Sequence, residues 1–145
     1  MRLKFTICNI CTSTAADTHV VAAVSVTNER CQCSGYGLYI GSIFTGAILY
    51  ADDIALLACS CLGLQRLVNI CVDYGLKCDI RFNPHKTQIA CFGGKSPEHN
   101  TIMIADQLLS WADRIKYLGC FFKAGTARLT LLHLLPDSMT LTTIF

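Results

Sequence analysis

The sequence predicts a small α+β domain in which antiparallel β-hairpins pack against one main amphipathic helix. Two observations support this class. Short apolar runs of strand length alternate with turn residues along the chain, and one segment repeats its apolar residues with the period of an α-helix. With 145 residues, 52% of them hydrophobic, the chain has enough apolar material for the core of one domain.

The first strong element is a hairpin. Two apolar runs, 46–50 and 54–58, flank a short link that contains Asp52 and Asp53. This spacing predicts two paired strands with the aspartates at the tip. Two adjacent carboxylates repel each other and lose hydration near apolar residues, so the tip needs either a bound cation or a solvated turn.

A helix is predicted next, over residues 62–76. Its apolar residues recur at helical spacing and are Leu64, Leu67, Val68, Cys71, Val72 and Leu76. Polar residues such as Gln65 and Asp73 occupy the opposite face. We therefore expect the apolar stripe to pack against the sheet that contains the hairpin.

Further strands are predicted at 80–82, 87–92, 101–104 and 115–122, with a turn at Asn83-Pro84. One more is possible at 19–26. The segments 1–35 and 124–145 otherwise receive no assignment, so the domain is expected to span residues 36–123.

Ten cysteines lie within apolar periodic segments rather than in a loop-rich background. We interpret most of them as reduced thiols, which indicates an intracellular protein. A zinc site built from Cys8, Cys11, Cys31 and Cys33 is the alternative, although the second pair is unusually close in sequence.

A membrane span is a further alternative, because residues 31–51 carry no charge and are long enough to cross a bilayer. Glycine, serine and threonine dilute the apolar character of this segment. The second hypothesis for function is thus a small cysteine-rich protein, metal-binding or membrane-associated, whose Asp-Asp turn is incidental.

Four elements in a fixed order resemble a known family. They are Tyr50-Ala51-Asp52-Asp53 at the hairpin tip, the amphipathic helix, the segment from Phe82 to Thr87 that leads into a strand, and Ile115 to Gly119. Together they resemble the palm subdomain of reverse transcriptases, in particular the non-LTR, LINE-type retrotransposon class. The resemblance covers residues 36–123 as a partial palm.

The resemblance implies an RNA-directed DNA polymerase that uses two Mg²⁺ ions for nucleotidyl transfer. Asp52 and Asp53 would be the catalytic metal ligands, since hard carboxylate oxygens on a rigid tip suit Mg²⁺. Lys86 would lie near the triphosphate and neutralise the pyrophosphate leaving group.

The same resemblance implies contacts with an RNA or DNA template-primer and a dNTP. Tyr50 and Ala51 would lie near the primer terminus or the incoming nucleotide. Tyr117, Leu118 and Gly119 would belong to a hairpin that grips the primer backbone.

The departures from the family are as informative as the matches. A palm needs a further catalytic aspartate from an earlier strand, and the family carries a glutamine-glycine segment upstream of the hairpin. Neither is found here, where Asp17 is the only aspartate before Asp52. We therefore expect a truncated palm that is inactive as a polymerase by itself.

Overall fold

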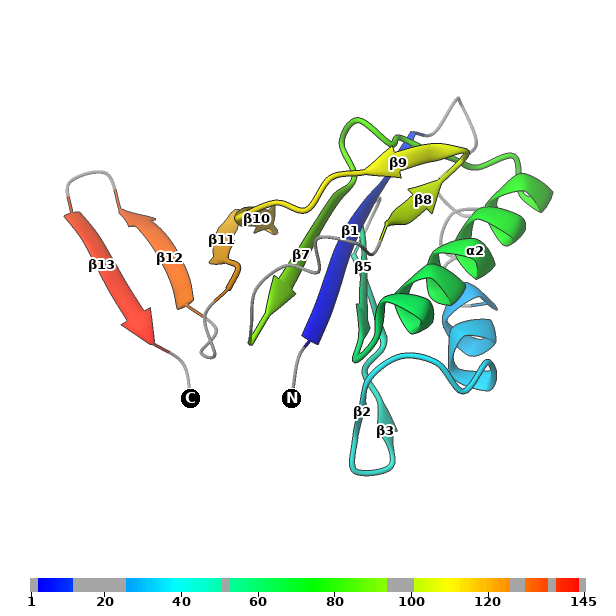
Figure 1. Ribbon diagram of the computed structural model, residues 1–145, viewed down its shortest axis with the longest axis horizontal. Helices are drawn as coiled ribbons and strands as arrows, with labels where there is room; N and C mark the ends of the chain where they lie inside the picture. Colours follow the sequence, from blue (N-terminus) through cyan, green and yellow to red (C-terminus); the bar gives the residue numbers. More distant parts are fainter. Residues whose placement is uncertain are drawn as a thin grey trace.

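The computed structural model describes residues 3–11, 26–50, 53–93, 101–125, 130–135 and 138–143, which form a mixed α+β structure with antiparallel hairpins (Figure 1). This confirms the predicted fold class. The strands of the first part are β1 (Leu3–Cys11), β2 (Tyr39–Ile40), β3 (Ile43–Phe44), β4 (Ala47–Tyr50) and β5 (Asp53–Ala58). The strands of the second part are β6 (Arg81–Phe82), β7 (Gln88–Phe92), β8 (Ile102–Ile104), β9 (Gln107–Leu109), β10 (Arg114–Tyr117), β11 (Cys120–Lys123), β12 (Thr130–Leu135) and β13 (Ser138–Thr143). Residues 26–33 are helical, and α2 spans Cys61–Lys77.

A five-stranded antiparallel sheet forms the centre of the described structure. Its strand order is β4-β5-β1-β6. Strands β6 and β7 share one edge of β1: β6 pairs with Ile10 and Cys11, and β7 pairs with residues 3–7. The long strand β1 therefore lies in the middle, between the hairpin β4–β5 and the strands that follow α2. With the helix over 26–33 between β1 and β4, the main elements follow the βαββαβ order of split βαβ folds.

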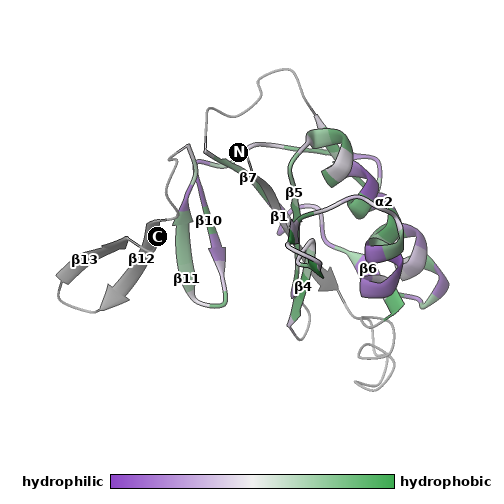
Figure 2. Cartoon of the chain, turned by 90° about the horizontal axis from the view of Figure 1, so that it is seen from below, coloured by the Kyte–Doolittle hydropathy of each residue, from purple (hydrophilic) through white to green (hydrophobic). Residues whose placement is uncertain are grey.

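Both helices cover one face of this sheet, as Figure 2 shows. The core on this side consists of buried residues from both helices and from the sheet, including Cys31, Ile54, Leu56, Leu64, Leu67, Val68, Cys71 and Ile89. The two helices also contact each other, because the guanidinium of Arg30 lies 4.9 Å from the ring centroid of Tyr74. The predicted stripe of α2 thus packs where the periodicity indicated.

The ends of α2 have clear local causes. The Ser60 side chain accepts a hydrogen bond from the Gly63 N–H at 3.0 Å and caps the first turn. At the other end Leu76 is 69% exposed, so its predicted place in the core stripe is wrong. At 3.6 residues per turn Leu76 lies about 120° around the helix from Leu64, and Gly75 takes the buried position instead.

The opposite face of the sheet carries a second core. It is made of Leu38, Ala55, Leu57, Ala90, Phe92, Ile115 and Tyr117. The last two belong to β10, which pairs with β11 as a hairpin and continues into β12 and β13. Figures 1 and 2 show β10 and β11 on the side of the sheet away from the helices. The segment 115–122, expected as strand, is in fact two strands joined by a turn.

Two smaller hairpins, β2–β3 and β8–β9, complete the described residues. The uncharged segment 31–51 contains β2, β3 and most of the hairpin strand β4 rather than one continuous helix. In the parts of the chain that the structure describes, no helix is both long and apolar enough to cross a membrane. The possible strand at 19–26 lies outside the described residues, apart from the helical Val26.

Candidate functional site

The hairpin β4–β5 forms as the sequence predicted, but Asp53 begins β5 rather than lying in the link between the strands. Tyr50 and Asp53 are directly paired at its end, so a two-residue link joins the strands. Ala51 and Asp52, which form this link, lie outside the described residues. Asp53 is the first residue of β5 and is half-buried, whereas Tyr50 is 62% exposed.

Strand alternation decides which face carries the Asp53 carboxylate. Ile54 and Leu56 pack toward α2, so Asp53, Ala55 and Leu57 belong to the other face. Tyr117 of β10 lies on that face and is buried. Burial, and secondly the charge of the nearby Asp53 carboxylate, raises the pKa of Tyr117 above its usual range. Asp53 and Tyr117, two predicted site residues that are 64 positions apart in the sequence, therefore lie near each other.

The turn after Tyr117 is tight. Leu118 and Gly119 have φ values of 48° and 80°, and positive φ at both central residues is the requirement of a two-residue type I′ hairpin turn. The hairpin is held beside β7 by the N–H of Lys116, which donates to the side-chain oxygen of Gln88 at 3.2 Å. Tyr117, Leu118 and Gly119 are therefore presented together by β10 and β11.

Lys86 belongs to the turn that precedes β7 and is exposed. The Asn83 side-chain oxygen accepts from the N–H of His85 at 3.0 Å and from that of Lys86 at 3.3 Å, which fixes this turn. The Thr87 hydroxyl donates to the Asn83 carbonyl at 2.8 Å. The Lys86 ammonium is thus carried by an ordered, exposed loop.

Strand register relates this turn to the hairpin tip. Gln88 of β7 and Ala55 of β5 are both register partners of Ile7, so they lie at the same level of the sheet. Lys86 lies two residues before Gln88 and Asp53 lies two residues before Ala55, which puts both at the same end of the sheet. Two interstrand spacings, about 10 Å, separate β5 from β7. The predicted site residues that the structure describes therefore gather at one end of the sheet.

Asn9 of β1 is a site position that the sequence did not reveal. It is the register partner of Asp53 on the neighbouring strand. The segment 3–11 received no assignment, although the alternation of apolar and polar residues from Leu3 to Ile7 is a strand signal. An earlier strand thus lies beside the hairpin, with position 9 as the register partner of Asp53.

Of the two predicted Mg²⁺ ligands, the structure describes only Asp53, which is half-buried. Asp52 and Asp53 are adjacent in sequence, and Mg²⁺ commonly uses one or two protein carboxylates together with water. Among the residues with described side chains, no three histidine, cysteine, aspartate or glutamate residues gather as a metal-binding group. A tightly held ion would need a further charged ligand.

The predicted zinc ligands do not share one environment in the described part. Cys31 is buried between the helices and hydrogen-bonds to Cys71, which lowers the pKa of Cys31, with burial acting in the opposite direction. Cys33 is exposed, and both are free thiols. The side chains of Cys8 and Cys11 lie outside the described part of the chain.

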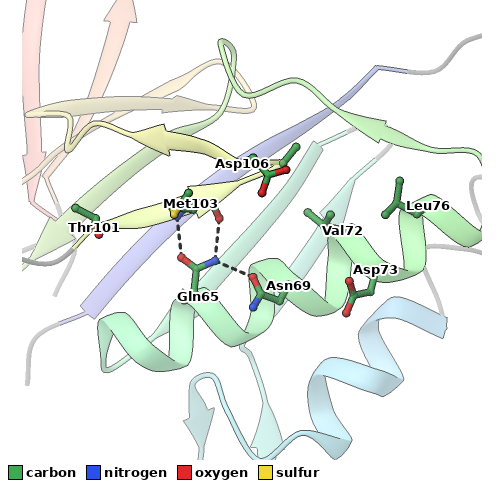
Figure 3. Close-up of a pocket in the computed structure, with 9 residues that line it drawn as sticks. Gln65, Asn69, Val72, Asp73, Leu76, Thr101, Met103 and Asp106 are labelled. Atoms are coloured by element: carbon green, nitrogen blue, oxygen red, sulfur yellow. Dashed lines mark hydrogen bonds between the residues drawn. The ribbon is translucent and has the colours of Figure 1, made fainter.

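A pocket of about 640 Å³ lies elsewhere, between α2 and β8 (Figure 3). The Gln65 side chain bridges its two walls, accepting from the Met103 N–H at 2.7 Å and donating to the Met103 carbonyl at 2.8 Å. Asp73 and Asp106 line the same pocket. This pocket belongs to the helix side of the sheet, whereas Asp53 belongs to the other face.

Comparison with known proteins adds no family. No protein-family model matches the sequence, and no curated protein matches it.

Proposed function

We propose that this chain is a catalytically incomplete palm of a reverse transcriptase of the non-LTR retrotransposon class. The observation that carries the proposal is the pairing of an earlier strand, β1, with the Tyr-Ala-Asp-Asp hairpin. The family resemblance requires an earlier strand beside the hairpin, and Leu3–Cys11 is such a strand. The hairpin, α2 and the β10–β11 turn also occur in the order that the resemblance implies.

The arrangement at the end of the sheet supports particular roles. Asp52 and Asp53 would hold Mg²⁺, which when bound activates a hydroxyl nucleophile and offsets the charge of a phosphate leaving group. Tyr50, exposed and paired with Asp53, would contact a nucleotide or primer end. Lys86 would contribute positive charge toward phosphate from the exposed turn.

Asn9 explains why we propose incomplete catalysis. A carboxamide is a neutral ligand, so the position opposite Asp53 adds no negative charge to hold a second divalent ion. Phosphoryl transfer depends on positioning and charge neutralisation, and both decline when an ion is lost. We therefore expect cation and nucleic-acid binding without polymerisation.

Manganese binding to the full 145-residue chain, followed by electron paramagnetic resonance, tests the metal ligands. Asp53→Asn and Asp52→Asn are each expected to weaken binding about tenfold or more, because half of the available ligand charge is lost. Asp79→Asn is the matched control, since Asp79 is exposed after α2 and has φ of 56°, which asparagine tolerates. Equal weakening in the Asp79→Asn control would contradict the assignment.

Fluorescence anisotropy with a labelled RNA–DNA hybrid duplex tests the partner. We expect salt-dependent binding that Lys86→Ala weakens and that Lys77→Ala, at the end of α2, leaves unchanged. Primer extension with Mg²⁺ or Mn²⁺ should give only background incorporation. Incorporation that Asp52→Asn abolishes would show that the site is complete, whereas absence of duplex binding would remove the polymerase proposal.

A further inference from the structure

Three cations and an aromatic ring share one face of the β10–β11 hairpin. Arg114 is the register partner of Lys123, and Lys116 is the register partner of Phe121. Side chains alternate between the two faces of a strand, and the intervening Ile115 packs into the second core. The other four side chains therefore lie on the face of the hairpin that points away from this core, where all three cations are exposed.

The Phe121 ring holds two of these cations without neutralising them. The guanidinium carbon of Arg114 lies 5.0 Å from the ring centroid, and the ammonium nitrogen of Lys116 lies 5.7 Å from it. An aromatic ring attracts a cation through its quadrupole, so the positive charge stays available to another partner. Among the described side chains, no carboxylate forms an ion pair with Arg114, Lys116 or Lys123.

This arrangement has an electrostatic cost. Like charges directly opposite each other on paired strands are destabilising, and Arg114 and Lys123 are paired in this way. Lys116 adds a third positive charge two residues from Arg114. A bound anion offsets such repulsion, so this face of the hairpin is complementary to a row of negative charges.

We propose that this cationic face, formed by Arg114, Lys116, Phe121 and Lys123, binds the phosphate backbone of single-stranded nucleic acid. Arg114 and Lys116 are alternate residues of one strand, so they lie about 7 Å apart along it. Successive phosphates of a nucleic-acid strand have a similar separation, which favours this polyanion over an isolated phosphate group. The inference goes beyond the proposed function, in which the hairpin turn and Lys86 contact the template-primer, and it involves no metal.

Fluorescence anisotropy of the full chain with a labelled oligo(dT) single strand in EDTA tests the cationic face. The double variant Lys116→Gln with Lys123→Gln should weaken binding about tenfold or more at low salt. Each lost phosphate contact lowers the slope of log affinity against log salt by about 0.7 for a single strand, so the double variant should lower it by about 1.4. Arg66→Gln with Lys77→Gln is the matched control, because it removes the same charge from exposed positions of α2 and should leave the slope unchanged.

Urea denaturation separates lost contacts from lost folding. Removal of Lys123 relieves its repulsion with Arg114, so Lys123→Gln should unfold at the same or a higher urea concentration than the unchanged chain. The single variants Lys116→Gln and Lys123→Gln, each expected to lower the salt slope by about 0.7, keep the test available if the double variant is destabilised.

Three outcomes overturn the inference. The first is a chain that binds no oligonucleotide, and the second is a salt slope that the variants of Lys116 and Lys123 leave unchanged. The third is an equal decrease of the slope in the α2 control, which would assign the binding to net charge. Stronger binding to phosphatidylserine vesicles than to the oligonucleotide would overturn the choice of nucleic acid as the partner.

Discussion

Asn9 of β1 is the antiparallel register partner of Asp53, the first residue of β5. The pairing puts an amide-bearing position directly across from a carboxylate at the end of the sheet. We predict that Asn9→Asp raises the affinity for Mn²⁺ or Mg²⁺ about tenfold, or about 1.4 kcal/mol, because a third carboxylate joins Asp52 and Asp53. Isothermal titration calorimetry measures this directly.

Two controls separate a ligand effect from a change in net charge. Gln32→Glu adds the same charge at an exposed position on the helix over 26–33 and should leave the affinity unchanged. The double variant Asn9→Asp with Asp53→Asn should lose the gain. If Gln32→Glu raises the affinity as much as Asn9→Asp does, long-range attraction rather than a ligand at position 9 is responsible.

The Tyr117 phenol provides a pH-dependent test of its contact with Asp53. Its folded pKa is raised, first by burial and second by the Asp53 charge. The stabilisation from this group is therefore present below the unfolded pKa of about 10 and is lost as the pH rises through the folded value. We predict that the free energy of unfolding falls above about pH 10 and that Tyr117→Phe reduces the fall, as measured by urea denaturation.

Absorbance at 295 nm distinguishes the two causes of the Tyr117 pKa. Asp53→Asn should lower the pKa of Tyr117 part of the way toward its usual value, since burial remains. The pKa of Tyr74 is also raised, chiefly by a hydrogen bond with Cys78, so Tyr74→Phe identifies its separate contribution to the titration. A Tyr117 titration that Asp53→Asn does not move would show that the carboxylate is too far away to matter.

Local patterns accounted for some elements of this fold and not for others. The hairpin β4–β5 and α2 follow from signals within about 20 residues: apolar runs around Asp52 and Asp53, and a stripe with helical period. The predicted burial of Leu76 was wrong, because position 76 lies to one side of the apolar stripe. Tertiary packing decides which residue of the last helical turn is buried.

The central strand could not be positioned from such patterns. Leu3–Cys11 is a strand by alternation, but its place between β5 and β7 depends on pairing with residues more than 40 positions away. The approach of Tyr117 to Asp53 likewise depends on how the β10–β11 hairpin covers the second core. Local sequence patterns therefore indicated the aspartates of the hairpin but not Asn9 as the register partner of Asp53.

The turn at Leu118 stores strain that a substitution can release. Leu118 has φ of 48°, a left-handed conformation that costs most residues about 1 kcal/mol or more and that asparagine tolerates. Its side chain is 49% exposed, so little burial is lost on replacement. We predict that Leu118→Asn stabilises the protein by about 1 kcal/mol in urea denaturation, because Asn-Gly is a preferred type I′ pair.

Leu108→Asn is the matched control for this change. Leu108 is 62% exposed on β9 and is not among the residues with positive φ. The control should be neutral or slightly destabilising, since asparagine is unfavourable in strands. Equal effects of the two substitutions would mean that the backbone conformation at Leu118 carries no measurable strain.

Gly75 allows α2 to approach the following strand closely. A Cβ at this position would lie 2.9 Å from the Ile80 carbonyl oxygen and 3.0 Å from the Phe82 ring. The Ile80 N–H donates to the Gly75 carbonyl at 2.8 Å, so the backbone cannot move away without breaking a bond. We predict that Gly75→Ala destabilises the protein by about 1–3 kcal/mol, although alanine is the better helix former by about 1 kcal/mol.

Gly63→Ala, nearer the start of α2, provides the comparison. A Cβ there would lie 3.0 Å from the Ser60 side-chain oxygen and 3.5 Å from the Ala58 side chain, and the Ser60 side chain can rotate about χ1, whereas the Ile80 carbonyl is fixed in the backbone. Its cost should be smaller, within about 1 kcal/mol of neutral, because the helix-propensity gain offsets a weakened cap. If urea denaturation finds Gly75→Ala as well tolerated as Gly63→Ala, the close contact between α2 and the Ile80 carbonyl does not exist in solution.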